Sequence, residues 1–238
     1  MRNKYASADA VVLEVIIRGR HMARCLRLRA VGIALAAASC GAAPARAADV
    51  IADWPSIQMP PPPTLKPATL DPKTTALLLF DFLNTNCNER PRCVEAIPKL
   101  KALMDRARAA GMLVAYTLPG GGKIVDPGIA PHDGEVVDQK PGGPDKFLGS
   151  DLDQRLKDHG IKTVILCGTS AQGVGIGTGS AAAQRGYYVA YPVDCLPSEN
   201  AFREAYATWH MAGGGPPVTT TWVTVTRSDM IKLENANH

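Results

Sequence analysis

The feature that most constrains the fold is an alternation, along residues 75–226, of short apolar runs with segments of helical periodicity. The apolar runs predict strands at residues 75–80, 112–116, 163–167, 187–193 and 220–226, and the periodic segments predict helices at residues 94–110, 152–159, 174–185 and 201–211. Apolar strands separated by helices are typical of a parallel sheet covered on both faces. The sequence therefore predicts one α/β domain at residues 74–238, a Rossmann-like three-layer sandwich with a mainly parallel six-stranded sheet.

The charge of the chain is unevenly distributed. It has 26 Lys and Arg residues against 22 Asp and Glu residues, a net charge of +4. Residues 1–47 hold eight of the basic and two of the acidic residues, so the remainder has 18 basic and 20 acidic residues, a charge of −2. A nucleic-acid binder needs a concentrated basic face, so this composition argues against a nucleic-acid partner.

The N-terminal region predicts export. A basic stretch from Met22 is followed by an apolar run through Ala38 and by small residues at 45–47, the pattern of a signal peptide cleaved near Ala48. The apolar run is too short to span a membrane, so we expect a periplasmic or secreted protein. A lipid anchor at Cys40 is an alternative, because the residues before it loosely resemble a lipobox.

The segment at residues 48–73 predicts a strap or linker. Seven prolines lie between Pro55 and Pro72. Such a segment favours an extended, semi-rigid chain and cannot join a central strand. We therefore expect the globular domain to begin near Asp71.

Four cysteines follow the predicted cleavage site. Cys87 and Cys93 close a short loop ahead of a helix and are the candidate disulfide. Cys167 and Cys195 lie near strand ends and are expected to be buried neighbours, bridged or free. The chain has no CxxC pair and no HExxH, so no metal or other cofactor is expected.

Candidate site residues come from the carboxyl ends of the predicted strands, where α/β sheets bind ligands. Asp81 follows a buried strand, where apolar surroundings favour the protonated carboxyl and suit an acid or base. Such an aspartate can also simply cap a loop. Lys140 lies on a loop after residues 136–139, with Lys146 as the competing candidate.

The glycine-rich segment after the strand at residues 163–167 is a second candidate. The backbone amides of Gly173 to Gly175, at the start of a helix, would suit an anion or oxyanion. The segment matches neither GxGxxG nor a Walker loop, which gives little support for nucleotide binding. Asp194 and Cys195 end the next strand and complete the set.

These pieces together resemble the isochorismatase-like cysteine-hydrolase superfamily, over residues 75 to about 226. LLLFDFLN resembles the family's first-strand motif, and DQKPGGPDKF followed by SDLDQRLKDHGIKTVILCGT resembles its lysine segment and fourth strand. The resemblance implies that Asp81 and Lys140 are the catalytic aspartate and lysine. It also implies a small-molecule substrate and a homo-oligomer.

The chain departs from this pattern at the nucleophile. In the family's cysteine hydrolases the thiol stands six residues after the strand-end glycine and four before a helix threonine. Counted from Gly168 and from Thr178, both spacings fall on Val174. A valine cannot attack a substrate, so the covalent cysteine route is closed. Cys195, and less readily Cys167, are the substitutes to be weighed.

Three functions are compatible with this departure. The first is an exported hydrolase that uses Asp81 and Lys140 without a thiol, as isochorismatases do when they protonate a vinyl ether for attack by water. The second is a catalytically inactive ligand-binding protein of the same fold. The third is an oligomeric assembly protein, packed through the small residues of the helix at 174–185.

Overall fold

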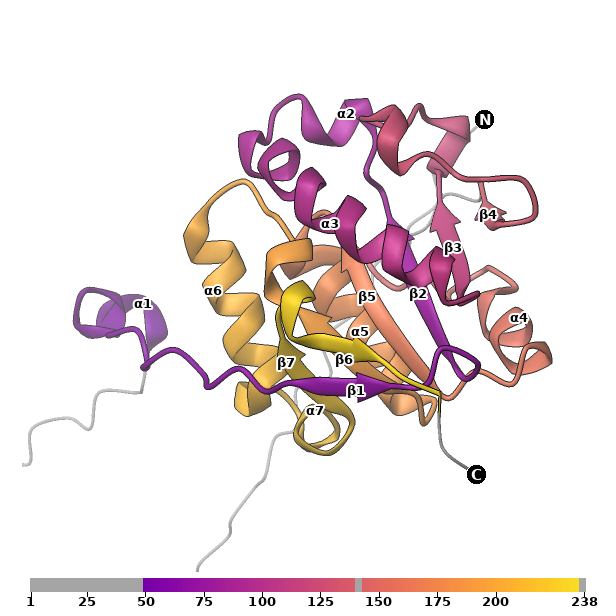
Figure 1. The fold of residues 1–238 in the computed structure, drawn as a ribbon. Coiled ribbons are helices and arrows are strands. Elements are labelled where there is room, and N and C mark those ends of the chain that lie inside the picture. The colour runs from indigo at the N-terminus through magenta and orange to yellow at the C-terminus, as the bar shows by residue number, and fades with distance from the viewer. Residues whose placement is uncertain (1–48, 140–142, 236–238) are drawn as a thin grey trace, which may run out of the picture. The chain divides into compact units, whose positions relative to one another are not determined.

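The computed structural model describes residues 49–139 and 143–235 (Figure 1). The described residues divide into two units, of which the first ends at Ile57 and the second begins at Gln58. In the first unit a short helix, α1 (Val50–Asp53), begins at Asp49, whose carboxylate accepts the Ile51 amide at 2.9 Å. A 3₁₀ turn, η1 (Trp54–Ser56), follows it.

The second unit is built on a six-stranded parallel sheet. Its strand order is β4-β3-β2-β5-β6-β7, and every neighbouring pair is parallel. The strands are β2 (Thr75–Phe80), β3 (Leu113–Thr117), β4 (Val136–Asp138), β5 (Thr163–Gly168), β6 (Tyr188–Pro192) and β7 (Val223–Thr226). The predicted fold class is confirmed. The sixth strand, which the apolar runs do not locate, is the edge strand β4.

Helices cover both faces of this sheet (Figure 1). They are α2 (Asn84–Cys87), α3 (Pro91–Ala109), α4 (Leu152–Asp158), α5 (Ile176–Gln184), α6 (Ala201–Trp209) and α7 (Pro217–Trp222). The apolar face of α3 packs in one core layer, and residues of α4, α5 and α6 pack in the other. Among the described residues, no helix combines the length and the apolar character needed to cross a membrane.

The sheet follows directly from the apolar run at its centre. All six residues of β2 are buried, because the side chains of alternate residues enter opposite core layers. Leu78 and Phe80 pack on the α5 side, and Leu77 and Leu79 pack on the α3 side. The carboxyl end of this central strand therefore lies at the middle of the sheet's edge.

The second unit begins earlier than the sequence predicts. Ala68–Leu70 forms β1, which pairs in parallel with β8 (Ile231–Leu233) in a separate two-stranded sheet. The Lys66 amide also donates to the carbonyl of Val225 at 3.0 Å. The last proline before the strand is Pro67, so no missing proline N–H interrupts the ladder. The predicted linker or strap at residues 48–73 thus contains one strand, β1, and its residues from Gln58 onward belong to the second unit.

One predicted strand is partly wrong. Residues 220–222 belong to α7, and the strand begins only at Val223. Pro217 occupies the first turn of the helix, and the Thr219 hydroxyl bonds back to the carbonyl of Pro216 at 2.8 Å. These local bonds outweigh the strand propensity of the threonine-rich run.

Candidate active site

Asp81 lies at the carboxyl end of β2 and carries the site. Its Oδ1 accepts a hydrogen bond from Thr117 Oγ1 at 2.7 Å, and Thr117 ends the neighbouring strand β3. The Asp81 backbone has φ 61, the left-handed region that residues other than glycine seldom adopt. Its carbonyl accepts the Leu83 amide at 2.7 Å and Asn86 Nδ2 at 3.0 Å. The loop therefore holds this aspartate in an unusual conformation, which is often found at functional sites.

A lysine completes the pair. Lys146 Nζ lies 2.6 Å from Asp81 Oδ2, and the two side chains are only 2% and 12% exposed. The competing candidate of the sequence analysis is therefore the residue that contacts Asp81. Lys140 lies outside the described residues, and its catalytic role stays a prediction.

The loop that carries Lys146 is fixed by helix α5. Thr178 Oγ1 donates to the carbonyl of Pro144 at 2.7 Å and accepts the amide of Lys146 at 3.1 Å. A Cβ at Gly177 would lie 2.7 Å from the Pro144 carbonyl oxygen, so this close approach requires glycine. Two residues of the small-residue helix thus position the ammonium.

The segment after β5 places Val174 in the core. It forms one π-type turn, η4 (Ala171–Gly175), before α5 begins. Val174 is buried in the α5 layer, and its Cγ2 lies 2.8 Å from where a Cβ of Gly168 would be. The amides of Gly173 and Gly175 both donate to the carbonyl of Ser170, at 3.1 and 3.2 Å. These two amides have internal partners, so their role in ligand binding stays a prediction.

The cysteines take separate places. Cys87 and Cys93 form a disulfide, with their Cα atoms 5.3 Å apart. Cys167 and Cys195 are free and buried in the α3 layer, across the sheet from Val174. Burial raises the pKa of the Cys167 thiol well above its usual value, and the neighbouring Cys195 and Asp194 act in the same direction. A buried, protonated thiol on the other face is a poor substitute nucleophile.

Asp194, the other strand-end aspartate of the sequence analysis, has a structural role. Its two carboxylate oxygens accept the amide and the hydroxyl of Ser228, each at 2.8 Å. These bonds tie the turn that directly follows β6 to η7 (Ser228–Met230). Asp194 therefore anchors the C-terminal segment.

The sequence analysis missed a polar network at the same edge of the sheet. Arg90 Nη1 donates to Thr169 Oγ1 at 3.1 Å, and Arg90 Nη2 lies 2.9 Å from Glu199 Oε1. Gln172 Nε2 donates to the same carboxylate at 3.0 Å. Its members are up to 109 residues apart in the chain, so only the polar residues after strand ends could have hinted at it.

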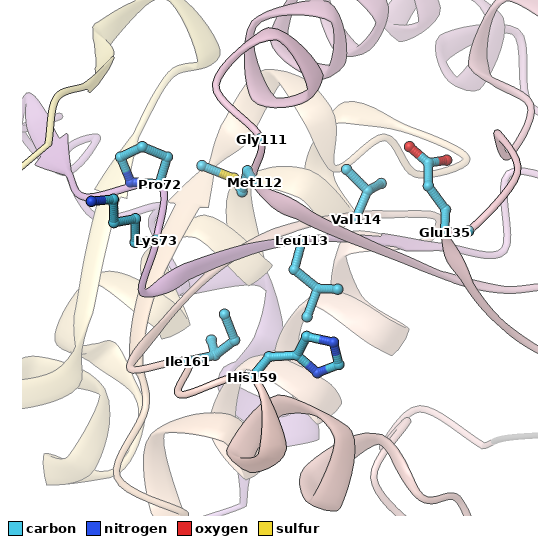
Figure 2. A pocket seen from close by; sticks show the side chains of 10 residues that line it. Pro72, Lys73, Gly111, Met112, Leu113, Val114, Glu135, His159 and Ile161 are labelled. Atoms are coloured by element: carbon cyan, nitrogen blue, oxygen red, sulfur yellow. The ribbon is translucent and has the colours of Figure 1, made fainter.

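A hollow of about 300 Å³ lies at the opposite end of the strands (Figure 2). Figure 2 shows Leu113 above His159 in this hollow, with Ile161 on one side of His159 and Glu135 on the other. The Glu135 carboxylate is bound by Arg108, and His159 Nδ1 lies 2.8 Å from the Arg155 carbonyl. The hollow therefore does not gather reactive groups as the Asp81 edge does. No cluster of metal-ligating side chains occurs within residues 49–139 and 143–235.

The family model of the isochorismatase domain matches residues 75–222, from the first residue of β2 to the end of α7. The chain belongs to the isochorismatase family. This confirms the resemblance read from the strand, lysine and glycine segments. No curated protein sequence matches the chain.

Solved structures of isochorismatase-like proteins share this fold. An isochorismatase family protein from Desulfovibrio vulgaris is 20% identical, with 66% of this chain and 95% of that chain covered and a TM-score of 0.56. N-carbamoylsarcosine amidase from Thermoplasma acidophilum is 23% identical, with 66% and 97% covered and a TM-score of 0.54. YcaC from Pseudomonas aeruginosa is 19% identical, with 70% and 81% covered and a TM-score of 0.57. These likenesses establish the isochorismatase fold alone.

Proposed function

We propose that this isochorismatase-family protein is an exported hydrolase of a small molecule that works by acid-base chemistry without a cysteine nucleophile. The observation that carries the proposal is the buried contact between Asp81 and Lys146 at the carboxyl end of the central strand. Carboxylates and lysines in such places exchange protons with a substrate or a water molecule. The family fold supports a hydrolase-like activity.

In the proposed reaction Asp81 moves the proton. Its Oδ2 contacts the Lys146 ammonium and its Oδ1 contacts the Thr117 hydroxyl, so both oxygens are oriented before a ligand arrives. Asp81 would donate a proton to, or accept one from, the reacting bond while water attacks. Lys146 would stabilise the negative charge of the carboxylate during this step, and Lys140 is the second lysine to be tested.

Substitution tests this proposal. Asp81→Asn keeps a side chain of the same size but cannot carry the proton, so we expect turnover to fall by roughly a hundredfold or more. The candidate substrates are small amides, carbamoyl compounds and vinyl ethers. Turnover is measured as the rate at which product forms. Asp194→Asn is the matched control, because that aspartate also follows the end of a strand, β6, and accepts hydrogen bonds only from Ser228 among the described residues. Unchanged turnover in folded Asp81→Asn would sink the acid-base mechanism.

The two lysines are tested in the same assay. Lys146→Met keeps the aliphatic stem and removes the ammonium that lies 2.6 Å from Asp81. We expect a loss of turnover comparable to that of Asp81→Asn. If Lys140→Met abolishes turnover and Lys146→Met does not, Lys140 is the catalytic lysine and the contact seen here is structural.

A non-catalytic ligand-binding role is the second candidate. Val174 is buried against Gly168, so a hydrocarbon occupies the position that the resemblance assigns to the nucleophile. Saturable binding of a small molecule without any product would favour this candidate. Loss of self-association after changes on the exposed side of α5, with neither binding nor turnover, would favour an assembly role.

Export is supported by the signal-like residues 22–47 and by the Cys87–Cys93 disulfide, since disulfides persist in oxidising compartments. We expect the mature protein to be periplasmic or secreted and to begin near Ala48. Fractionation and the mass of the mature N-terminus test this. A lipid-modified Cys40 at the N-terminus would replace the soluble product with an anchored one.

A further inference from the structure

Arg90 is held at the candidate site by covalent and hydrogen bonds. It lies inside the loop that the Cys87–Cys93 disulfide closes. Its amide donates to the Cys87 carbonyl at 2.9 Å, and its carbonyl accepts the Cys93 amide at 2.8 Å. The backbone of Arg90 is thus bonded to both cysteines, and its side chain extends from a fixed point.

The guanidinium of Arg90 lies beside the end of the central strand. Phe80 of β2 pairs with Gly168 of β5, so Asp81 and Thr169 each lie one residue beyond this last pair of the two adjacent strands. The Thr169 amide donates to the Phe80 carbonyl at 3.1 Å. Arg90 Nη1 donates to Thr169 Oγ1, so Thr169 links the guanidinium to the end of β2.

The cluster formed by Arg90, Glu199 and Arg203 has a net positive charge. Glu199 contacts both Arg90 at 2.9 Å and Arg203 at 2.8 Å, so two guanidinium groups share one carboxylate. Burial alone would raise the pKa of Glu199, but its hydrogen bonds and the two arginines hold it below the usual value, and the carboxylate stays ionised. One positive charge is left over.

The guanidinium also keeps donors for a ligand. It carries five N–H groups, and its contacts with Thr169 and Glu199 use two of them within the described part of the chain. The side chain is 23% exposed, so water or a ligand reaches it. An arginine with spare donors and a surplus charge is well suited to a planar carboxylate.

We propose that Arg90 binds a carboxylate of the small molecule whose reacting bond lies at Asp81. The ligands of this site are therefore small carboxylic acids, and Arg90 selects them over uncharged analogues of the same shape. This inference rests on the proposed function for the position of the reacting bond. The disulfide fixes the backbone of Arg90, and Thr169 and Glu199 orient its guanidinium. Arg203 also pairs with Glu199 and offsets the negative charge of that carboxylate.

Three pairs of probes test this selection: malonamate, succinamate and glutaramate, each against its own diamide. The two members of a pair differ only in the carboxylate. With the oxidised mature protein we expect at least one acid to bind about tenfold more tightly than its diamide by calorimetry, because a hydrogen bond between two charged groups is stronger than one between neutral groups. Arg90→Gln should bring this ratio to about one, and Arg90→Lys should restore part of it.

Arg92→Gln is the matched control. Arg92 lies in the same disulfide loop, and Arg92→Gln removes the same charge as Arg90→Gln. Arg92 pairs with Glu204, however, and not with Thr169 and Glu199. We expect it to keep the wild-type ratio. A wild-type ratio near one for every pair, or a ratio that survives Arg90→Gln, overturns the proposal. If Arg90→Gln lowers the urea midpoint but leaves the ratio of acid to diamide affinity unchanged, Arg90 has a structural role only. That result also overturns the proposal.

The outcome is separable from that of the proposed function. Asp81→Asn should lose turnover while it keeps the preference for the acid, because Arg90 remains in place. If Asp81→Asn keeps turnover, the acid-base mechanism fails while the acid-to-diamide ratio still decides the role of Arg90. If turnover depends on Asp81 and no acid is preferred, the mechanism stands and the inference about Arg90 is wrong.

Discussion

Two poorly exposed ion pairs, Arg108–Glu135 and Lys146–Asp81, occupy opposite ends of the sheet and are built differently. Arg108 makes two bonds to Glu135, at 2.8 and 2.9 Å, and two more to the Tyr116 hydroxyl and the Ala130 carbonyl. Lys146 reaches Asp81 through one contact of 2.6 Å, on a residue with left-handed backbone. The arginine binds its carboxylate in a bidentate manner, whereas the lysine binds a carboxylate that also accepts from Thr117 and belongs to a residue with a left-handed backbone.

The difference teaches how to tell structural from functional pairs. Both pairs have side chains that are 15% exposed or less, so burial does not separate them. Arg108 lies at the C-terminal end of α3 and joins the helix to the loop before β4, where it secures the edge of the sheet. Asp81 lies at the carboxyl end of the central strand, where α/β sheets bind ligands. Position and the left-handed backbone of Asp81, rather than burial, are therefore the grounds on which we propose the second pair as the functional one.

The largest expected effect is on stability, at the structural pair. Arg108→Met leaves Glu135 without its cation and leaves the Tyr116 hydroxyl and Ala130 carbonyl without their donor. We expect the free energy of unfolding to fall by about 3 kcal/mol, because one partner of a buried pair is removed. Urea unfolding measures it. Lys101→Met, which breaks an exposed i,i+4 pair with Asp105, is the control and should cost less than about 0.5 kcal/mol.

The same pair predicts a dependence on pH. Burial alone would raise the pKa of Glu135, but hydrogen bonds from Arg108 and from the His132 amide hold it below its usual value. A depressed native pKa stabilises the fold above the unfolded value of about 4.3, and this stability is lost as the pH falls through the native pKa. The urea midpoint of Glu135→Gln should therefore approach that of the wild type between pH 6 and pH 3. A gap between the two that does not change with pH would contradict this assignment.

A third variant tests the wall of the functional site. Val174→Cys places a thiol where the resemblance puts the family's nucleophile and removes one methyl group, at a cost of about 1 kcal/mol. If Val174 borders the site, iodoacetamide should alkylate this thiol while the buried Cys167 and Cys195 stay unmodified. Mass spectrometry counts the adducts. Because Val174 is only 5% exposed, an adduct at position 174 would show that a small reagent reaches it, and no adduct would show that the core encloses this position.

The sequence predicts the framework of this molecule better than its loops. The run at residues 75–80 gives β2 with its observed bounds, because a threonine followed by five apolar residues suits a strand that is covered on both faces. It also places Asp81 at the strand end. The choice between Lys140 and Lys146 cannot be made in this way, since the path of the Lys146 loop depends on Pro144 packing against Gly177.

The contacts of Arg90 show the same limit. Arg90 and Thr169 are 79 residues apart, and no local periodicity brings an arginine in a disulfide loop to the end of a distant strand. The disulfide is predictable from its spacing, but the direction of the side chain is set by the packing of α3 and β5. Such long-range polar contacts therefore cannot be predicted from local sequence patterns.

The smallest expected effect is that of removing both charges of the functional pair. Asp81→Asn combined with Lys146→Met eliminates the attraction and both desolvation costs together, which is often neutral or stabilising. Asn accepts the left-handed backbone of position 81 and can still bond Thr117, and Met replaces the aliphatic stem of the lysine. We expect the free energy of unfolding to change by less than about 1 kcal/mol, and each single change to cost more than the double change.

A cycle of four variants in urea measures this, with Arg108→Met/Glu135→Gln as the contrast. That double variant should remain destabilised, because Tyr116 and Ala130 still lack their donor. If both double variants lose the same free energy of unfolding, the two ion pairs contribute equally to stability. The Asp81–Lys146 pair then does not differ from a structural pair.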